Sequence, residues 1–381
     1  MRKKCRLCGH DLLSPPLLTL RGMPRAAQFF PLKENLKKDG CTALNICQCS
    51  QCGLVQLANK PVDYYRDVIR ASGISKEMRT FRIAQFKEWI AQNHLENKKI
   101  LEVGCGNGEY LSLLKEAGGN AFGLEHNESS VNNCKAQGLN VETGFFETGT
   151  EILENKPFGA FLILNWLEHI PNINLFLRGI HDNLTPDAVG IVEVPNFTMM
   201  SKKGLITEFS SEHLFYFSEK TLSFALESCG FEVMQCRPIW HDYILSANVQ
   251  KRKTIETKTF SDTKKAIVNQ LDSFAKRHRK LAVWGAGHQA LAVLCMANIS
   301  KKIQYVVDSS PQKQNHFTFA THIPIVVPEQ LKASPVDALM IICGGYSDEV
   351  ARLVQNRSFP KMSIAILRED KLEIIKDTLL D

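Results

Sequence analysis

Apolar runs of strand length alternate with segments of helix length from residue 96 to residue 250. The strand-like runs are KKILEVG, NAFGLE, FGAFLILN, AVGIVEVP and FEVMQCRPIW, and GEYLSLLKEAG has the pattern of a helix closed by glycine. Strands that alternate with helices are typical of a doubly wound parallel sheet. We therefore expect an α/β domain over residues 96–250.

A second α/β domain is expected over residues 276–381. KLAVWGAG, IQYVVDSS, DALMIICGG and MSIAIL are again apolar runs of strand length. The two α/β regions are separated by VQKRKTIETKTFSDTKK, which is polar and charged. This composition predicts a linker over 251–275 that turns helical toward Phe274.

The front of the chain has a different pattern. Residues 1–60 are punctuated by cysteine and proline, with short strand-like pieces such as ALNICQC and GLVQLA. Within 61–95, apolar residues then recur at the spacing of one helical face: Met78, Phe81, Ile83, Phe86, Trp89 and Ile90. We expect a small cysteine domain at 1–60 and a helical linker at 61–95.

The overall composition is that of a globular protein. The chain has 381 residues, of which 44% are hydrophobic and 23% charged, and this length favours two or three domains. The longest apolar run, FLILNWL, is too short to cross a bilayer, and no apolar segment follows the basic start MRKK. We expect a cytoplasmic monomer without membrane contact. The net charge of +6 suits a phosphorylated small substrate as well as nucleic acid.

The twelve cysteines indicate thiols or metal ligands, because disulfides are rare in the reducing cytosol. Four of them form two CxxC pairs, Cys5/Cys8 and Cys49/Cys52, which favour a structural zinc ion held by tetrahedral sulfur ligands. A site closed by four thiolates leaves no position for water, so we expect no hydrolytic chemistry there. A free-thiol or redox role is the alternative.

A glycine loop follows the first strand of the central domain. ILEVGCGNGEYL places Gly104, Gly106 and Gly108 between a strand and a helix, where glycine permits a tight turn and close approach to a ligand. A dinucleotide fingerprint needs a small residue at the next position, which is Glu109. The loop instead resembles motif I of class I S-adenosylmethionine (SAM)-dependent methyltransferases, with the acidic Glu102 two residues before the first glycine.

That resemblance implies how SAM is bound. The glycine backbone would cradle the methionine part, and Glu125, at the end of the next strand, would accept the ribose hydroxyls. NWLEHIPN resembles the segment after the fourth strand, so Asn165 would line the cofactor cleft. Four features occur in the order of a Rossmann-like class I methyltransferase core: the glycine loop, Glu125, LEHIPN and EVPN. The alternative is an α/β core with an incidental glycine turn.

The candidate base lies after the fifth strand, in SSEHLFYFSEK. Glu212 and His213 are adjacent there, and histidine is the usual general base near neutral pH. We predict His213 as the base and Glu212 as the carboxylate that orients it or holds its proton. A bracing role for the histidine is the alternative. Asn196, Ser210 and Tyr216 are predicted to contact the substrate.

Taken together, the domains resemble the three-domain sugar-nucleotide C-methyltransferases. The resemblance rests on a cysteine-rich front, a core with EHLFYFS, and a C-terminal α/β domain with VVDSSPQKQ and HIPIVVPEQL. It implies that His213 removes the proton beside the ketone of a nucleotide-linked keto-deoxy sugar, whose enolate carbon then takes the methyl group. It also implies that the C-terminal domain binds the nucleotide, and that a segment with Tyr64, Tyr65 and Ser72 covers the cofactor. A role at the entry of the following helix is the alternative for these three residues.

Three positions depart from that family's usual pattern. The glycine loop is GCGNG rather than SNDG, LEHIPN stands where LAHVPD is common, and Ser210 occupies the position of a tyrosine. These differences leave methyl transfer to an oxygen or nitrogen atom, of a sugar or another small molecule, as an alternative.

The C-terminal domain allows a rival interpretation. Gly285, Gly287 and Ala290 fit a dinucleotide fingerprint, and Asp308 ends the next strand. Alone they would indicate a nicotinamide-dependent oxidoreductase domain, although no set of hydride-transfer residues accompanies them. A nucleic-acid-binding methyltransferase is a third class, suggested by the cysteine module and basic residues but not supported by a ladder of aromatic residues.

Overall fold

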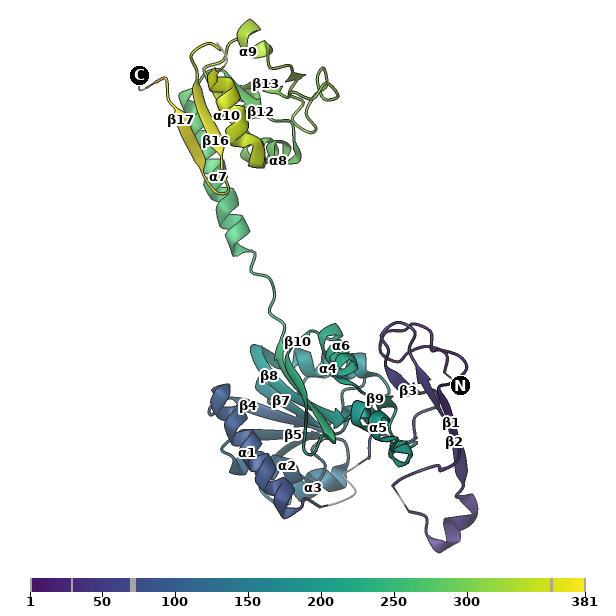
Figure 1. The fold of residues 1–381 in the computed structure, drawn as a ribbon. Helices are drawn as coiled ribbons and strands as arrows, with labels where there is room; N and C mark the ends of the chain where they lie inside the picture. The colour runs from purple at the N-terminus through teal and green to yellow at the C-terminus, as the bar shows by residue number, and fades with distance from the viewer. Residues whose placement is uncertain (1, 29, 69–72, 357–358, 380–381) are drawn as a thin grey trace. The chain divides into compact units, whose positions relative to one another are not determined.

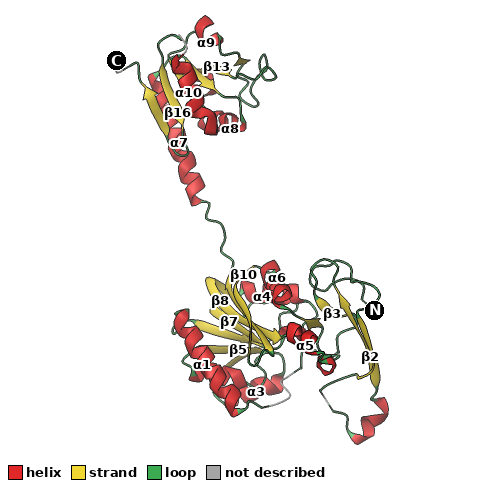
Figure 2. Ribbon diagram, viewed as in Figure 1, coloured by secondary structure: helices red, strands yellow, loops and turns green. Residues whose placement is uncertain are grey.

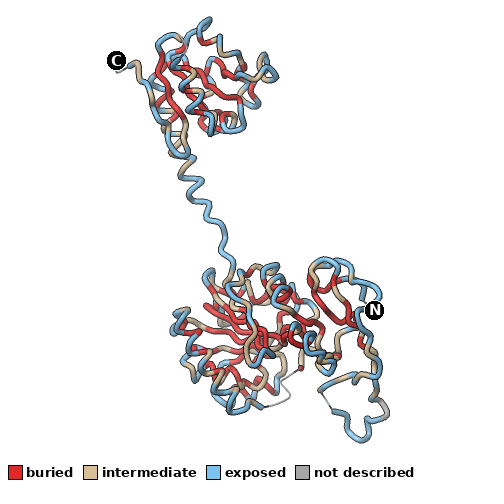
Figure 3. The backbone as a smooth tube through the Cα atoms, viewed as in Figure 1, coloured by how far each residue is buried: buried red, intermediate tan, exposed pale blue. Residues whose placement is uncertain are grey.

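The computed structural model describes residues 2–28, 30–68, 73–356 and 359–379 (Figure 1). The chain divides into two compact units, Met1–Lys253 and Thr254–Asp381. Buried residues concentrate on the sheet of each unit (Figure 3). Ser72, one of the residues expected over the cofactor, lies outside the described residues.

The first unit is built on a seven-stranded sheet with the order β10-β11-β8-β7-β4-β5-β6. Its strands are β4 (Lys99–Val103), β5 (Asn120–Glu125), β6 (Asn140–Thr143), β7 (Phe158–Leu164), β8 (Leu184–Pro195), β10 (Phe231–Ile239) and β11 (Ile244–Lys251). The strands from β8 to β6 are parallel, whereas β11 pairs antiparallel with both β8 and β10. The predicted parallel sheet therefore ends at β8, because β10 and β11 are joined by a turn too short for a crossover helix.

Helices cover both faces of this sheet (Figure 2). They are α1 (Lys76–Gln92), α2 (Glu109–Glu116) and α3 (Glu128–Ala136) on one face, and α4 (Ile173–Asp182) and α6 (Glu219–Ser228) on the other. Strand β7 serves both cores, since Phe161 and Ile163 pack with α4 while Leu162 and Leu164 pack with α1 and α2. Alternate residues of a strand point to opposite faces, so a doubly covered strand is apolar throughout.

A second, smaller sheet joins the front of the chain to this core. Its order is β1-β2-β3-β9, with β1 (Leu18–Pro24), β2 (Cys41–Gln48), β3 (Val55–Leu57) and β9 (Phe215–Tyr216). Strand β9 belongs to the EHLFYFS segment and pairs Tyr216 with Val55. Cys5, Leu7 and Leu54 share one buried cluster with the methyltransferase-like core. The cysteine module and the central α/β domain are therefore one compact unit.

The second unit has a six-stranded sheet with the order β14-β13-β12-β15-β16-β17. The strands are β12 (Leu281–Trp284), β13 (Ile303–Val307), β14 (Ile325–Val326), β15 (Ala338–Ile341), β16 (Ser363–Leu367) and β17 (Leu372–Lys376), and only the β16–β17 pair is antiparallel. Helices α7 (Lys258–Arg277) and α8 (His288–Ala297) pack on one face, and α9 (Gln330–Ala333) and α10 (Ser347–Asn356) on the other.

The predicted linker over 251–275 is largely helical. Helix α7 occupies 258–277, and Leu271 and Phe274 on it are buried in the second unit. The segment between β11 and α7 is therefore much shorter than the polar composition suggested. Among the described residues, no helix is both long and apolar enough to cross a membrane.

Candidate active site and four-cysteine cluster

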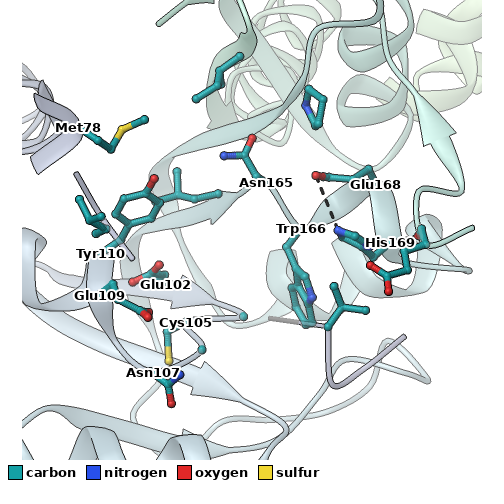
Figure 4. Close-up of a pocket in the computed structure, with 18 of the residues that line it drawn as sticks. Met78, Glu102, Cys105, Asn107, Glu109, Tyr110, Asn165, Trp166, Glu168 and His169 are labelled. Carbon is teal, nitrogen blue, oxygen red and sulfur yellow. Dashed lines mark hydrogen bonds and ion pairs between the residues drawn. The ribbon is translucent and has the colours of Figure 1, made fainter. Parts of the chain in front are cut away.

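A cavity of about 610 Å³ opens at the carboxyl ends of β4 and β7. Reactive centres of doubly wound sheets lie at this edge. The glycine loop after β4 forms one wall, and the segment Asn165–His169 after β7 forms another (Figure 4). Glu212 and His213 also line the cavity, and the cysteine module contributes Ala27 and Gln28. The structure thus gathers in one cavity residues that the sequence places in four separate segments.

Two positions of the glycine loop after β4 require glycine. Gly104 and Gly108 have φ values of +75° and +83°. A Cβ atom on Gly104 would lie 2.3 Å from the Trp166 ring, and one on Gly108 would lie 2.6 Å from Leu139. Gly106, at φ +55°, has space around it and exposes its backbone toward the cavity. The loop is therefore open to a ligand at its middle and tightly packed at both ends.

The Glu125 carboxylate accepts a hydrogen bond from the backbone of this loop. Its Oε2 accepts the Gly106 amide at 2.8 Å, and its Oε1 accepts the Asn127 amide at 2.8 Å. The side chain is buried, and this burial raises its pKa even though the backbone donors oppose the shift. The other two predicted cofactor residues, Glu102 and Asn165, line the cavity. Asn165 has a φ of +54°, an unusual backbone conformation directly after β7.

The Ser210 hydroxyl binds the backbone amides of Glu212 and His213. Its Oγ accepts the amide of Glu212 at 3.2 Å and that of His213 at 3.3 Å. The Tyr216 hydroxyl accepts the Ser210 amide at 3.2 Å, and Tyr216 itself is buried in the small sheet. Both Ser210 and Tyr216 were predicted to contact substrate, and here they shape the turn that carries the pair.

Two segments from the front of the chain bind the Glu212 carboxylate. The Tyr64 hydroxyl donates to Oε1 at 2.7 Å, and the Ala27 amide donates to the same oxygen at 3.0 Å. Burial and the neighbouring carboxylate raise the pKa of Tyr64, so the phenol keeps its proton and donates it. Tyr64 was expected near the cofactor, but the sequence could not indicate its contact with Glu212.

The half-buried His213 lies beside the buried Glu168 and His169, and the ligand-type atoms of the three residues lie within 4.8 Å of one another. The rings of His169 and His213 are 4.8 Å apart and nearly perpendicular, and His169 Nδ1 lies 3.1 Å from the Glu212 carbonyl. Burial lowers the pKa of His213 to about 4 and holds that of His169 well below 6.5. Both imidazoles are therefore neutral at pH 7, as a general base must be.

Glu168 was not singled out from the sequence. It follows β7 in the 3-10 helix Leu167–His169, is 2% exposed, and lines the cavity. Burial raises the pKa of this carboxyl to about 8. Its sequence signal is the departure noted above, because LEHIPN in place of LAHVPD puts Glu168 where the resembled family has alanine.

Asn196, predicted to contact the substrate, caps a helix in the structure. Its Oδ1 accepts the amides of Thr198 and Met199 and so caps the helix Phe197–Lys203. Its Nδ2 donates to the Asp242 carbonyl at 2.8 Å. Because both ends of the amide are engaged in backbone contacts, Asn196 serves here as a helix cap and turn brace.

The four predicted metal ligands meet in one cluster. The Sγ atoms of Cys5, Cys8, Cys49 and Cys52 lie within 4.8 Å of one another. The Cys8–Cys49 and Cys5–Cys52 pairs are 3.3 and 3.8 Å apart, too long for disulfides and close to the spacing of about 3.8 Å around tetrahedral zinc. Gln56 donates to Cys5 Sγ at 3.1 Å from strand β3. The donor set and spacing fit a structural zinc ion.

The glycine loop of the second unit is held in the same way as the first. Asp308 accepts the amides of Ala286 and Ser310, at 2.8 and 2.9 Å. Lys313 also pairs with its carboxylate at 3.0 Å, and with the backbone donors it holds the pKa of Asp308 below its usual value despite burial. The acid that a dinucleotide site would direct at a ribose therefore carries a lysine of its own chain.

Comparison with known proteins gives one family match within the first unit and another that begins in the last strand of that unit and continues into the second. Residues 76–236 match the family described as "Methyltransferase domain", and residues 250–367 match "C-methyltransferase C-terminal domain". The C-methyltransferase NovU of Streptomyces niveus is 22% identical over 385 residues, covering 91% of each chain. The ubiquinone biosynthesis O-methyltransferase of Rickettsia typhi is 27% identical over 131 residues, covering 33% of this chain and 53% of that protein.

Among solved structures, a SAM-dependent methyltransferase from Clostridium acetobutylicum aligns with a TM-score of 0.37 and 11% identity, covering 46% of this chain and 92% of that one. The family match at 250–367 concerns the domain for which a dinucleotide-dependent oxidoreductase was the rival interpretation. The chain is therefore a SAM-dependent methyltransferase, with a four-cysteine cluster in front of its class I core and, behind it, an α/β domain that matches the C-methyltransferase C-terminal family.

Proposed function

We propose that this enzyme methylates a carbon atom beside the ketone of a nucleotide-linked keto-deoxy sugar. The observation that carries the proposal is the position of neutral His213 in the same cavity as the glycine loop, beside a carboxylate held by two hydrogen bonds. A neutral imidazole can remove the proton next to a ketone, and the resulting enolate carbon is a nucleophile. Bound SAM would supply an electrophilic methyl group at this position.

The cofactor would be held by the residues around the glycine loop. Gly106, between the tightly packed Gly104 and Gly108, leaves room for the methionine part. Glu102 and Asn165 line the same cavity. Glu125 keeps unused lone pairs beyond its two backbone contacts, so it can still accept ribose hydroxyls.

The role of Glu212 in this proposal is to orient the substrate and the base. Its position is set by Tyr64 and Ala27, and its backbone carbonyl contacts His169, which packs against His213. Glu212 is thus connected to the base through its backbone and His169, while its side chain is held by the front of the chain.

We also propose that Cys5, Cys8, Cys49 and Cys52 hold a structural zinc ion and that the second unit binds the nucleotide part of the substrate. The first rests on the sulfur spacing. The second rests on the glycine loop at Gly285 and on the C-methyltransferase family match of this unit. Thermal unfolding of the full chain tests it: a thymidine diphosphate sugar should raise the melting temperature, whereas NAD should not.

Methyl transfer to oxygen is the second candidate. It is favoured by the ubiquinone O-methyltransferases, which match part of the core, and by Ser210 at the position where related C-methyltransferases carry tyrosine. The acceptor atom distinguishes the two reactions, because a carbon-bound and an oxygen-bound methyl group have different chemical shifts.

One experiment tests the main proposal. The enzyme is incubated with ¹³C-methyl SAM and a thymidine diphosphate-linked 4-keto-6-deoxyhexose, and the product is analysed by NMR. We expect a new carbon–carbon bond with the wild type and none with His213→Asn, which should still bind SAM. Loss of SAM binding in His213→Asn would instead indicate a bracing role, and an oxygen-bound methyl group would favour the second candidate.

A further inference from the structure

Glu168 occupies an unusual position for an acidic residue. Its side chain is 2% exposed, and among the described residues no hydrogen-bond partner reaches its Oε2 atom. Its Oε1 lies 3.9 Å from Nε2 of His169 (Figure 4). An ionised carboxylate without donors would be strongly unfavourable in such a place. The surroundings therefore select the protonated form of Glu168.

The electrostatics of the cavity support the same protonation state. Burial raises the pKa of Glu168 to about 8, against the weaker effect of its own backbone amide. The neighbouring His169 and His213 are neutral, since burial lowers the pKa of both. Among the described residues that line the cavity there is no lysine or arginine. No fixed cation is therefore available in the described walls to stabilise a carboxylate, or any other anion formed there.

The proposed reaction creates such an anion. Removing the proton beside a ketone places negative charge on the carbonyl oxygen, and enzymes stabilise that oxygen with preorganised hydrogen-bond donors. Two nearby tyrosines have their hydroxyl protons engaged elsewhere: Tyr64 donates to Glu212 and Tyr243 donates to Glu208. Glu168 is a buried acid of the same cavity with a proton still available for donation.

We infer that Glu168 is a second catalytic residue, a neutral carboxylic acid that donates its proton to the ketone oxygen while His213 removes the neighbouring hydrogen. This inference rests on the proposed function. It also fits the spacing, because the ligand atoms of Glu168, His169 and His213 lie within 4.8 Å of one another. The carbonyl oxygen and the adjacent carbon of one ketone can therefore be reached together by an acid and a base.

The proton balance of this step is closed. The electron pair of the C–H bond forms the carbon–carbon double bond, the carbonyl π pair moves to oxygen, and this oxygen takes the proton of Glu168. When the carbon takes up the methyl group from sulfur, the double-bond pair forms the new C–C bond and the C–S pair stays on sulfur. The enol proton then returns to Glu168, and His213 releases its proton to solvent.

The test compares Glu168→Gln and Glu168→Ala with the wild type, with Glu227→Gln as a control. Glu227 is exposed on α6, and its substitution should leave all rates unchanged. Three quantities are measured: deuterium exchange beside the ketone of the thymidine diphosphate-linked 4-keto-6-deoxyhexose in D₂O without SAM, the rate of methyl transfer, and the Kd for SAM. Gln retains the shape of Glu and an N–H donor, so it also serves as the folding control.

We expect Glu168→Ala to slow both exchange and transfer by about 10²–10³-fold, the range for losing an oxyanion donor. Glu168→Gln can donate a hydrogen bond but cannot transfer a proton, so it should fall between Ala and the wild type. The Kd for SAM should change less than twofold. Rates for Glu168→Ala within threefold of the wild type would overturn the inference, and so would losses that accompany lost SAM binding in both variants.

A metal site is the competing interpretation of the same three residues, because two histidines and a carboxylate are a known ligand set. Metal analysis of the purified wild type and Glu168→Gln decides between them. A divalent ion beyond that of the four-cysteine cluster, lost in Glu168→Gln, would overturn the acid role. If the wild type neither exchanges the hydrogen nor methylates carbon, the proposed function itself has failed and the inference falls with it. If the wild type does both and Glu168→Ala matches it, only the inference has failed.

Discussion

The phenol of Tyr64 donates a 2.7 Å hydrogen bond to Oε1 of Glu212, 148 positions further along the chain. The Ala27 amide donates to the same oxygen, and strand β9, directly after Glu212 and His213, completes the sheet of the cysteine module. The front of the chain therefore does more than precede the methyltransferase core. It positions the carboxylate beside the proposed base.

Replacing Tyr64 by Phe removes this donor and keeps the ring. We expect kcat to fall about tenfold or more, because a hydrogen bond to a charged group contributes roughly 1.5–3 kcal/mol, while the Kd for SAM stays unchanged. A double-mutant cycle with Glu212→Ala checks the cause, since the two losses should not add if Tyr64 acts through Glu212. Additive losses would show that Tyr64 acts elsewhere.

The four-cysteine cluster predicts a link between metal and activity. We expect one zinc ion per chain in the purified protein, lost in Cys8→Ser and Cys49→Ser. Losing it should disorder the module, because the binding free energy of structural zinc is largely folding free energy. Ala27 and strand β9 would then lose their positions, so methyl transfer should fall at least tenfold.

Cys295→Ser is the matched control for this experiment. Cys295 is an exposed thiol on α8 in the second unit, outside the cluster, and its substitution should change neither zinc content nor rate. Full activity in zinc-free Cys49→Ser would contradict the proposed link between the module and the active site.

The parts of this structure that follow local patterns could be predicted from the sequence. Helix α1 and strands β4, β5 and β7 lie where periodicity placed them, because amphipathic spacing and apolar runs are local signals. The antiparallel β10–β11 hairpin was missed, since FEVMQCRPIW on its own does not reveal the direction of its partner. Contacts such as Tyr64–Glu212 depend on how distant segments pack, and no spacing rule reports them.

The same limit applies to individual site residues. Glu212 and His213 could be named together because they are adjacent, and the glycine loop because its turn requires glycine at Gly104 and Gly108. Glu168 differed from the alanine of LAHVPD, but this difference did not reveal its chemistry, which comes from burial beside two neutral histidines in the folded chain. The sequence also did not indicate that the Asn196 side chain caps a helix.

A buried ion pair anchors α1 to the sheet. Arg82 and Glu193 lie 2.6 Å apart with both side chains fully buried, and Gln85 bridges them. Replacing Arg82 by Met leaves a buried carboxylate without its cation, so we expect a loss of about 3–5 kcal/mol in the free energy of unfolding. Urea denaturation followed by tryptophan fluorescence measures it, since Trp89 lies on the same helix.

The exposed pair Arg79–Glu116 is the matched control, because α1 supplies its arginine as well. Arg79→Met should cost less than about 1 kcal/mol. Arg82→Met with Glu193→Gln should recover part of the loss, because the second change removes the uncompensated charge. Equal losses for Arg82→Met and Arg79→Met would show that the buried pair contributes nothing beyond a surface one.

The opposite pKa shifts of His213 and Glu168 predict the pH dependence of methyl transfer. His213 must be neutral, and burial lowers its pKa to about 4, so activity should persist well below pH 6.5 and fall only as the pH approaches 4. Glu168 must be protonated, and burial raises its pKa to about 8, so activity should fall as the pH rises through 8. Other titratable groups line the same cavity: Glu102, Cys105, Glu109, Tyr110, His169, Glu212 and Tyr243.

Glu168→Gln separates the acidic and alkaline limbs of this pH profile, because it removes the titrating acid and leaves His213. We expect kcat/KM of this variant to be lower but constant from pH 7 to pH 9, while the wild type falls tenfold per pH unit above 8. Stability should change in the same sense. A carboxyl whose pKa is raised on folding stabilises the folded chain fully below its unfolded pKa of 4.5, and this contribution is lost as the pH rises to about 8. The wild type should therefore lose stability relative to Glu168→Gln between pH 5 and pH 8. If kcat/KM of both proteins fell in the same way above pH 8, the titration would belong to another group.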